Sequence, residues 1–144
     1  MDFKPHITVA TVVEKDGSYL LVEEYASGRL VFNQPAGHLE AGETLQEAAL
    51  RETMEETGWQ VELHGVLGVS LYTAPGNGVT YLRTTFAARP VAQLHQSLDE
   101  GIERALWMRY EEMLEYVEKM RSPMVIESVE RFRGGDLYPL ELVD

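Results

Sequence analysis

Residues 37–59 read GHLEAGETLQEAALRETMEETGW, and this stretch constrains the chain more than any other. The segment Thr44-Leu45-Gln46-Glu47 fits a capping box before an apolar run, and Gly58 fits a left-handed cap. The stretch therefore predicts a helix over residues 44–57. Five glutamates fall in its middle, with Arg51 as the only basic residue: Glu43, Glu47, Glu52, Glu55 and Glu56. So much like charge on one short helix needs a physical reason.

Three of these glutamates share one helical face, because Glu52, Glu55 and Glu56 are spaced i, i+3 and i+4. Like-charge pairs at these spacings cost about 0.2–0.5 kcal/mol each, and the helix dipole disfavours acids in the last turn. The same face begins with Leu45, Ala48 and Ala49. The carboxylates therefore extend a packing surface, whereas a solvated acidic face would place basic partners four residues away. Carboxylates that break several local rules together indicate a site for a hard cation.

The charge of the whole chain limits its partners. Its 144 residues contain 24 acids and 12 bases, for a net charge of −12. Such a field repels nucleic-acid polymers and anionic membranes, but it allows a small anion that divalent metal ions bridge to the protein. The chain has no cysteine and no apolar run of about 18 residues, and its first residues, MDFKPHITVA, lack the apolar core expected of a signal peptide. We expect a cytoplasmic protein.

The remaining pattern alternates strands and helices within one expected domain. Asp16-Gly17 predicts a hairpin between the first two strands. Strands are expected over 6–13, 18–24, 29–33, 59–73, 79–89 and 102–108. Further helices are expected over 110–120 and from Pro123, behind a Ser122 cap, to Gly134. This order predicts a mixed α/β fold with helices packed on a largely antiparallel sheet.

The acidic helix carries a family motif. Gly37, five residues, Glu43, seven residues and then the segment 51–59 (RETMEETGW) resemble the Nudix box. Two positions depart from the usual pattern: Thr53 replaces an aliphatic residue, and Ala36 stands where many members have a second glycine. The resemblance implies that residues 1–144 form a single Nudix domain, an α/β/α sandwich with a mixed central sheet.

Shorter segments extend the resemblance from one end of the chain to the other. FKPHITVA, NQPAGHLEAGETL, RSPMVIES and YPLEL are similar to the NudJ-type phosphatases of this family. The similarity implies Mg²⁺-dependent hydrolysis, with Mn²⁺ as a possible substitute, of nucleoside tri- and diphosphates and thiamine-type pyrophosphates. Small-molecule diphosphates are then the partners, and we expect a monomer or a weak homodimer.

The resemblance also implies roles for the residues of the site. Glu52, Glu55 and Glu56 would bind the metal and so take part in catalysis, with a backbone carbonyl at Ala36 as a further ligand. Four residues would support them: Gly37, Glu43, Arg51 and Gly58. Arg51 would hold the cluster through a carboxylate such as that of Glu43. Without metal, mutual repulsion should raise the pKa of at least one glutamate.

The general base has two candidate positions. Family members use either a glutamate of the box or an acid in a later loop, and the loop acids here are Asp99 and Glu100. We expect Glu52 to be the base and rank Glu100 second. Arg29, Arg83 and His38 are the candidates for contacts with substrate phosphates.

Aromatic side chains and the other histidines give weaker predictions. Phe32, Tyr72 and Tyr81 could stack on a ring, although core packing explains any one of them, and Trp107 is expected in the core. His6, His64 and His95 show no mutual spacing that would indicate a site.

Three other functions remain open at this point. One is an enzyme that removes damaged nucleotides and releases pyrophosphate. The second is a binding module that keeps the box without catalysis, and the third is an acidic domain that binds basic proteins. Product analysis, a phosphate-release assay and a binding screen would separate them.

Overall fold

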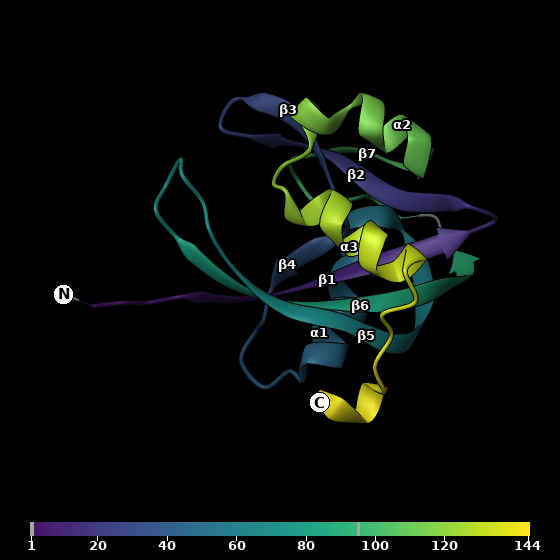
Figure 1. Cartoon of the computed structure of the whole chain (residues 1–144), viewed down its shortest axis with the longest axis horizontal. Coiled ribbons are helices and arrows are strands. Elements are labelled where there is room, and N and C mark those ends of the chain that lie inside the picture. Colours follow the sequence, from purple (N-terminus) through teal and green to yellow (C-terminus); the bar gives the residue numbers. More distant parts are fainter. Residues whose placement is uncertain (1, 95) are drawn as a thin grey trace.

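A computed structural model describes residues 2–94 and 96–144 of the chain (Figure 1). The strands are β1 (His6–Lys15), β2 (Ser18–Ala26), β3 (Arg29–Asn33), β4 (Ala36–His38), β5 (Trp59–Thr73), β6 (Thr80–Gln93) and β7 (Ile102–Arg109). The α-helices are α1 (Leu45–Thr57), α2 (Tyr110–Glu115) and α3 (Met124–Arg133), and two short 3₁₀ helices, η1 (Val117–Lys119) and η2 (Leu140–Leu142), follow α2 and α3. None of these helices has the length and apolar character needed to cross a membrane.

The sheet is mixed, which confirms the expected fold class. Its strands run in the order β3-β2-β1-β6-β5, with β4 added beside β1 and β7 beside β2. The β1–β6 pair is parallel and the other named pairs are antiparallel. Because β1 lies at the centre, it is buried on both faces and reads as a nearly continuous apolar run.

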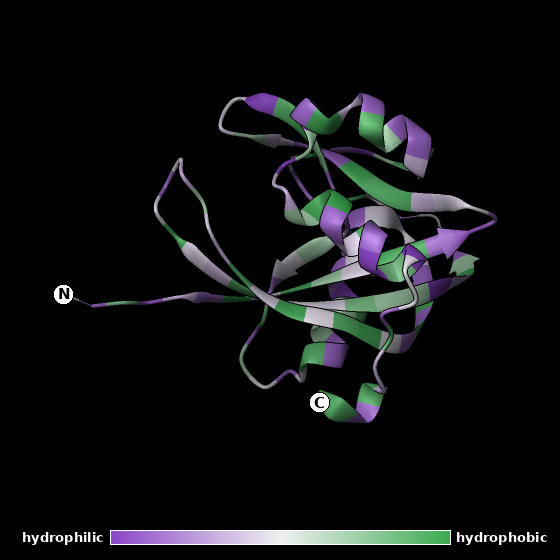
Figure 2. Ribbon diagram, viewed as in Figure 1, coloured by the Kyte–Doolittle hydropathy of each residue, from purple (hydrophilic) through white to green (hydrophobic). Residues whose placement is uncertain are grey.

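Helices cover both faces of this sheet. Val9 and Val13 of β1 pack in one core cluster with Ala48 and Ala49 of α1. Val12, on the opposite face of the same strand, packs in a second cluster with residues of α2 and α3. Figure 2 shows hydrophobic and hydrophilic residues side by side on α2 and α3, as expected for helices with one buried face. The result is three layers, with the sheet between helices.

Helix α1 begins and ends as its sequence predicts. The Thr44 hydroxyl accepts from Glu47 N at 3.1 Å, and the Glu47 carboxylate accepts from Thr44 N at 2.9 Å. Gly58 ends the helix with φ 75°, and a Cβ at this position would lie 3.0 Å from the carbonyl oxygen of Leu94. Both the left-handed backbone and the close approach of Leu94 therefore require glycine there.

Residues 36–38 differ from the prediction, because they form β4 and not a loop. They pair with Thr8, Val9 and Ala10 of β1. Three residues that include a glycine and follow a proline show no alternating pattern, so the sequence could not reveal this strand. Pairing with the central strand fixes this segment directly beside α1.

The chain after β7 also differs from the predicted 110–120 helix. Helix α2 ends at Glu115, and η1 follows it. Phe32 and Met120 then form a bridge, and Arg121 N donates to Phe32 O at 2.8 Å. These contacts hold the chain extended beside β3, so the helix cannot continue. Helix α3 starts at Met124, one residue later than expected, and its first N–H donates to the Ser122 hydroxyl at 3.2 Å.

Strand β6 continues past its predicted end at residue 89. Pro90 pairs with Val61 of β5 next to a register shift, and pairing with β1 stops at Ala88. The proline nitrogen therefore faces a free edge, where no hydrogen bond is lost.

Candidate active site

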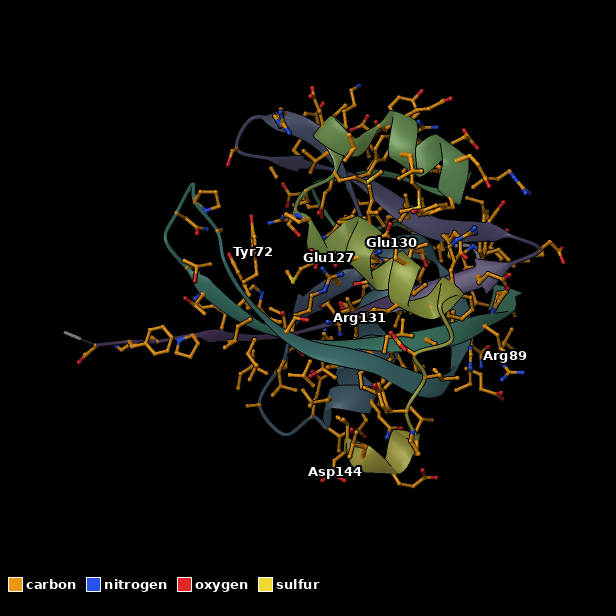
Figure 3. The ribbon with its side chains drawn as sticks, in the orientation of Figure 1. Tyr72, Arg89, Glu127, Glu130, Arg131 and Asp144 are labelled. Atoms are coloured by element: carbon orange, nitrogen blue, oxygen red, sulfur yellow. The ribbon has the colours of Figure 1, made fainter. Side chains whose placement is uncertain are left out.

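A cleft of about 630 Å³ opens between β4, α1, the β5–β6 hairpin, the β2–β3 turn and the start of α3. Its volume is within the range of small-molecule sites. Figure 3 shows Tyr72 on the hairpin, with its side chain directed toward this space. The polar side chains that line the cleft include Glu24, Asn33, His38, Glu40, Glu52, Glu56, Asn77, Arg83, Arg121 and Ser122.

Three acids gather beside this cleft. Carboxylate oxygens of Glu52, Glu55 and Asp99 all lie within 4.8 Å of one another. The Asp99 N–H donates to Glu55 O at 3.0 Å, which fixes the loop against the end of α1. Glu100 is exposed and is not part of this group. Of the two loop acids, the structure therefore places Asp99, and not Glu100, with the box glutamates.

Glu56 is buried beside the same cleft, with 8% of its surface exposed. Its Oε1 accepts a hydrogen bond from Ala36 N at 2.9 Å. The pKa of Glu56 is raised to about 9, first by burial and then by the nearby carboxylates of Glu24, Glu52 and Asp99, although the hydrogen bond from Ala36 lowers it. Burial also raises the pKa of Glu52. The expected increase is thus present, but burial is its first cause and mutual repulsion comes second.

Arg51 connects the acids, through Glu43 as the resemblance implied and also through Glu52 and Glu55. One Nη donates to Glu52 and to Glu55, both at 2.7 Å, while the other donates to Glu43 at 2.9 Å and to His38 O at 3.0 Å. The bond from Arg51 lowers the pKa of Glu43. A single guanidinium therefore ties the start of α1, its acidic end and β4 together.

Position 37 has no room for a side chain, because a glutamate of the box faces it. A Cβ on Gly37 would collide with the carboxylate of Glu52. Ala36 fits its position without strain, because it is an ordinary β residue and has no positive φ. The Ala36 N–H donates to Glu56 of the acidic site. That the Ala36 carbonyl binds a metal stays a prediction.

The candidate substrate residues divide into two groups. Arg83 and His38 line the cleft, whereas Arg29 is exposed, donates to Glu118 O at 3.0 Å and does not line it. The bond to Glu118 O holds Arg29 against η1, outside the cleft. His38 bonds to His6 at 2.9 Å, and burial followed by the charge of His6 lowers the pKa of His38.

The aromatic candidates divide in the same way. Tyr72 and Tyr81 line the cleft, while Phe32 belongs to the core with 4% of its surface exposed. Trp107 packs edge-to-face on Trp59 with ring centroids 5.5 Å apart, as expected for a core residue. His64 makes an edge-to-face contact with Phe132 and does not line the cleft, and His95 lies outside the described residues.

Sequence reasoning missed a second polar group in the cleft. The Glu24 carboxylate accepts from Arg121 at 2.7 Å and from Asn33 Nδ2 at 3.3 Å, with 7% of Glu24 exposed. One signal was available: Glu23 and Glu24 are consecutive in a strand, so one of the two had to face inward. Nothing local indicated Arg121, which reaches Glu24 across 97 residues of sequence.

The acidic group fits a hard divalent cation. Glu52, Glu55 and Asp99 offer only oxygen ligands, close enough for one ion, and Glu56 lies beside them at the cleft. A metal ion bound there would offset phosphate charge and activate water. The protein contributes the carboxylates, the Arg51 bonds that orient them and the cleft beside them.

Comparisons with known proteins agree with this geometry. The NUDIX domain family matches residues 3–127. Phosphatase NudJ from Escherichia coli strain K12 is 43% identical over 143 residues, which cover 98% of this chain and 92% of the relative. A NUDIX hydrolase from Nitrosomonas europaea superposes with a TM-score of 0.95 at 41% identity, over 98% of this chain and 97% of the other.

A more distant structure shares the fold alone. A MutT protein from Methanosarcina mazei Go1 superposes with a TM-score of 0.74 at 21% identity, over 92% of this chain and 96% of that one. Nudix hydrolases use a divalent metal and act on small phosphorylated substrates, as the acidic group and the cleft suggest. The chain belongs to the Nudix family and is a hydrolase of phosphoanhydride bonds.

Proposed function

We propose that this enzyme uses Mg²⁺ to remove terminal phosphates from small diphosphate-containing molecules. Its substrates would be nucleoside tri- and diphosphates and thiamine-type pyrophosphates, with orthophosphate as the product. The observation that carries the proposal is the group of Glu52, Glu55 and Asp99, which lies beside a cleft large enough for a small nucleotide. The similarity to phosphatase NudJ supports a phosphatase-like product.

The acidic residues take distinct roles in this proposal. Glu52, Glu55 and Glu56 bind the metal, with the Ala36 carbonyl as a further ligand. Glu52 is the proposed general base, because it faces the cleft and burial raises the pKa of its carboxyl, so it can accept a proton from water. Asp99 replaces Glu100 as the second candidate for the general base.

The organic part of the substrate would lie toward the β5–β6 hairpin. Tyr72 and Tyr81 line this part of the cleft, and their rings can pack against a base or a pyrimidine. His38 stands between Tyr81 and the box, with ring centroids 6.3 Å apart, and can donate to a phosphate.

A substrate panel tests the proposal. Nucleoside tri- and diphosphates, thiamine diphosphate, dinucleotides and nucleotide sugars are incubated with Mg²⁺ or with EDTA, and turnover is measured. We expect turnover of the tri- and diphosphates and of thiamine diphosphate with Mg²⁺ only. Equal turnover in EDTA, or no turnover of any diphosphate, would reject the proposal.

A further inference from the structure

The cleft contains two guanidinium groups whose partners differ. Arg121 bonds to the Glu24 carboxylate at 2.7 Å, so its charge has a partner. Arg83 instead donates to the neutral amide oxygen of Gln34 at 2.7 Å. Arg83 is buried, with only 5% of its surface exposed. Within residues 2–94 and 96–144 it nevertheless forms no ion pair. One buried cation in the cleft therefore lacks an anion.

Arg83 cannot avoid this charge by losing its proton. Burial and the nearby Arg121 lower the pKa of Arg83 to about 10, which leaves the guanidinium charged at neutral pH. A buried charge is costly unless it is paired and hydrogen-bonded. Its Nε–H is also buried without an acceptor in the described part of the chain. The missing charge partner is explained if an anion occupies the cleft beside Arg83.

The surrounding contacts hold Arg83 in this orientation. The Gln34 Nε2 donates to Val125 O at 2.6 Å, so the amide that binds Arg83 is fixed to α3 and cannot move away. Gln34 is 1% exposed. The guanidinium is therefore preorganised, which lowers the cost of binding a ligand.

Arg83 also lies at a useful place relative to the acidic group. Thr8 of β1 pairs with His38 of β4 on one side and with Arg83 of β6 on the other. Arg83 is thus two strands from β4, roughly 10 Å across the sheet. Since Gly37 and Ala36 of β4 contact Glu52 and Glu56, one cleft spans both groups.

We propose that Arg83 forms an anion subsite that works without metal and holds the phosphate group that remains on the organic product. The identification of this anion as a phosphate rests on the proposed function. A diphosphate would place its terminal phosphate at the metal and its other phosphate at Arg83. A monophosphate would occupy Arg83 alone, with no phosphate left to be cleaved. The subsite therefore explains why hydrolysis should stop at the monophosphate.

Binding to the metal-free enzyme tests this subsite. In EDTA, calorimetry measures the affinity of the full chain for adenosine monophosphate, thiamine monophosphate and inorganic phosphate, with adenosine as the uncharged control. We expect wild type to bind at least one of the phosphates. Arg83→Gln should weaken that binding about 10-fold or more, because hydrogen bonds to charged groups are the strong ones.

Two further variants separate charge from folding. Arg89→Gln removes the same charge from the same strand, but Arg89 is exposed and far from Tyr72 in Figure 3, so binding should not change. Arg83→Lys keeps the charge and should recover part of the affinity that Arg83→Gln loses. Melting curves in the same buffer show that each variant is folded.

Several results would overturn the subsite. The subsite is wrong if wild type binds no phosphate without metal, or if adenosine binds as tightly as its monophosphate. It is also wrong if Arg83→Lys binds the phosphate as weakly as Arg83→Gln. Failure of the subsite differs from failure of the proposed function. Wild type that hydrolyses diphosphates with Mg²⁺ but binds no monophosphate in EDTA contradicts only the subsite. Wild type that binds a monophosphate in EDTA but hydrolyses nothing contradicts only the function.

Discussion

Glu56 and Glu47 lie on the same helix and differ only in their surroundings. Glu56 is buried beside the cleft, whereas Glu47 is exposed and completes the capping box. We expect Glu56→Gln to reduce turnover by at least about 10²-fold, because metal activation carries most of the chemistry. Glu47→Gln should retain most activity, since glutamine still completes the box. Steady-state phosphate release measures both, and equal losses would show that the acidic face of α1 is wrongly assigned.

Asp99 and Glu100 provide a matched test of the loop acid. Both side chains are exposed, but only Asp99 lies with Glu52 and Glu55. Asp99→Asn should lower turnover by about 10-fold or more at limiting Mg²⁺, because a ligand charge is lost. Glu100→Gln should remain within about twofold of wild type, since it alters only a solvated side chain. The opposite ranking would restore Glu100 as the second candidate for the base.

Thr53, the residue that departs from the usual box, has a buried polar partner. Its hydroxyl donates to Ala49 O and lies 2.8 Å from that of Thr11, which must therefore donate to it. Thr53→Val should destabilise the protein by about 1–3 kcal/mol, because it leaves the Thr11 hydroxyl buried without an acceptor. Denaturant unfolding measures the loss. The double variant Thr11→Val, Thr53→Val should recover most of it, and equal loss in both would contradict this explanation.

Residues close in sequence were predicted best. The spacing of Glu52, Glu55 and Glu56 placed them on one face, because helical geometry is local. Arg121, Gln34 and Glu24 were missed, since their contacts depend on distant parts of the chain that the sheet and α3 bring together. Composition alone gives no sign of such contacts.

At the scale of elements, Glu56 of α1 makes the free energy of unfolding depend on pH. The pKa of Glu56 rises from its ordinary value of 4.5 to about 9 in the folded protein. Between these values the folded state holds a proton that the unfolded state has lost. The free energy of unfolding in EDTA should therefore fall as pH rises from about 5 to 9.

A variant isolates this contribution from other titrating groups. Glu56→Gln cannot ionise, so its melting temperature should fall less over the same pH range than that of wild type. Melting curves in EDTA at several pH values measure the difference. Parallel curves for the two proteins would show that Glu56 does not carry the shifted pKa.

Elements with strong local signals were predicted well. Helix α1 has a complete N-terminal cap and a glycine end, and the β1–β2 hairpin has Asp16-Gly17 with positive φ at both residues. Strand β4 was not predicted, because it forms only through pairing with β1. The short length of α2 was not predicted either, because the bridge between Phe32 and Met120 ends the helical segment. Tertiary contacts decided both cases.

At the scale of the whole molecule, the sheet brings together two groups of opposite charge. The acids of α1 and the 96–101 loop lie beside one end of the cleft, and Arg83 lines it from β6. In a chain with a net charge of −12, a metal ion and a buried cation would each offset the repulsion of an anionic substrate. This arrangement suits a chain of phosphates more than a single one.

A time course of products shows whether water attacks the terminal phosphorus. Adenosine triphosphate is incubated with the enzyme and Mg²⁺ without added pyrophosphatase, and nucleotides, orthophosphate and pyrophosphate are separated at successive times. We expect orthophosphate from the start, a transient diphosphate and monophosphate as the final nucleotide. Early pyrophosphate together with monophosphate, without a diphosphate intermediate, would contradict it.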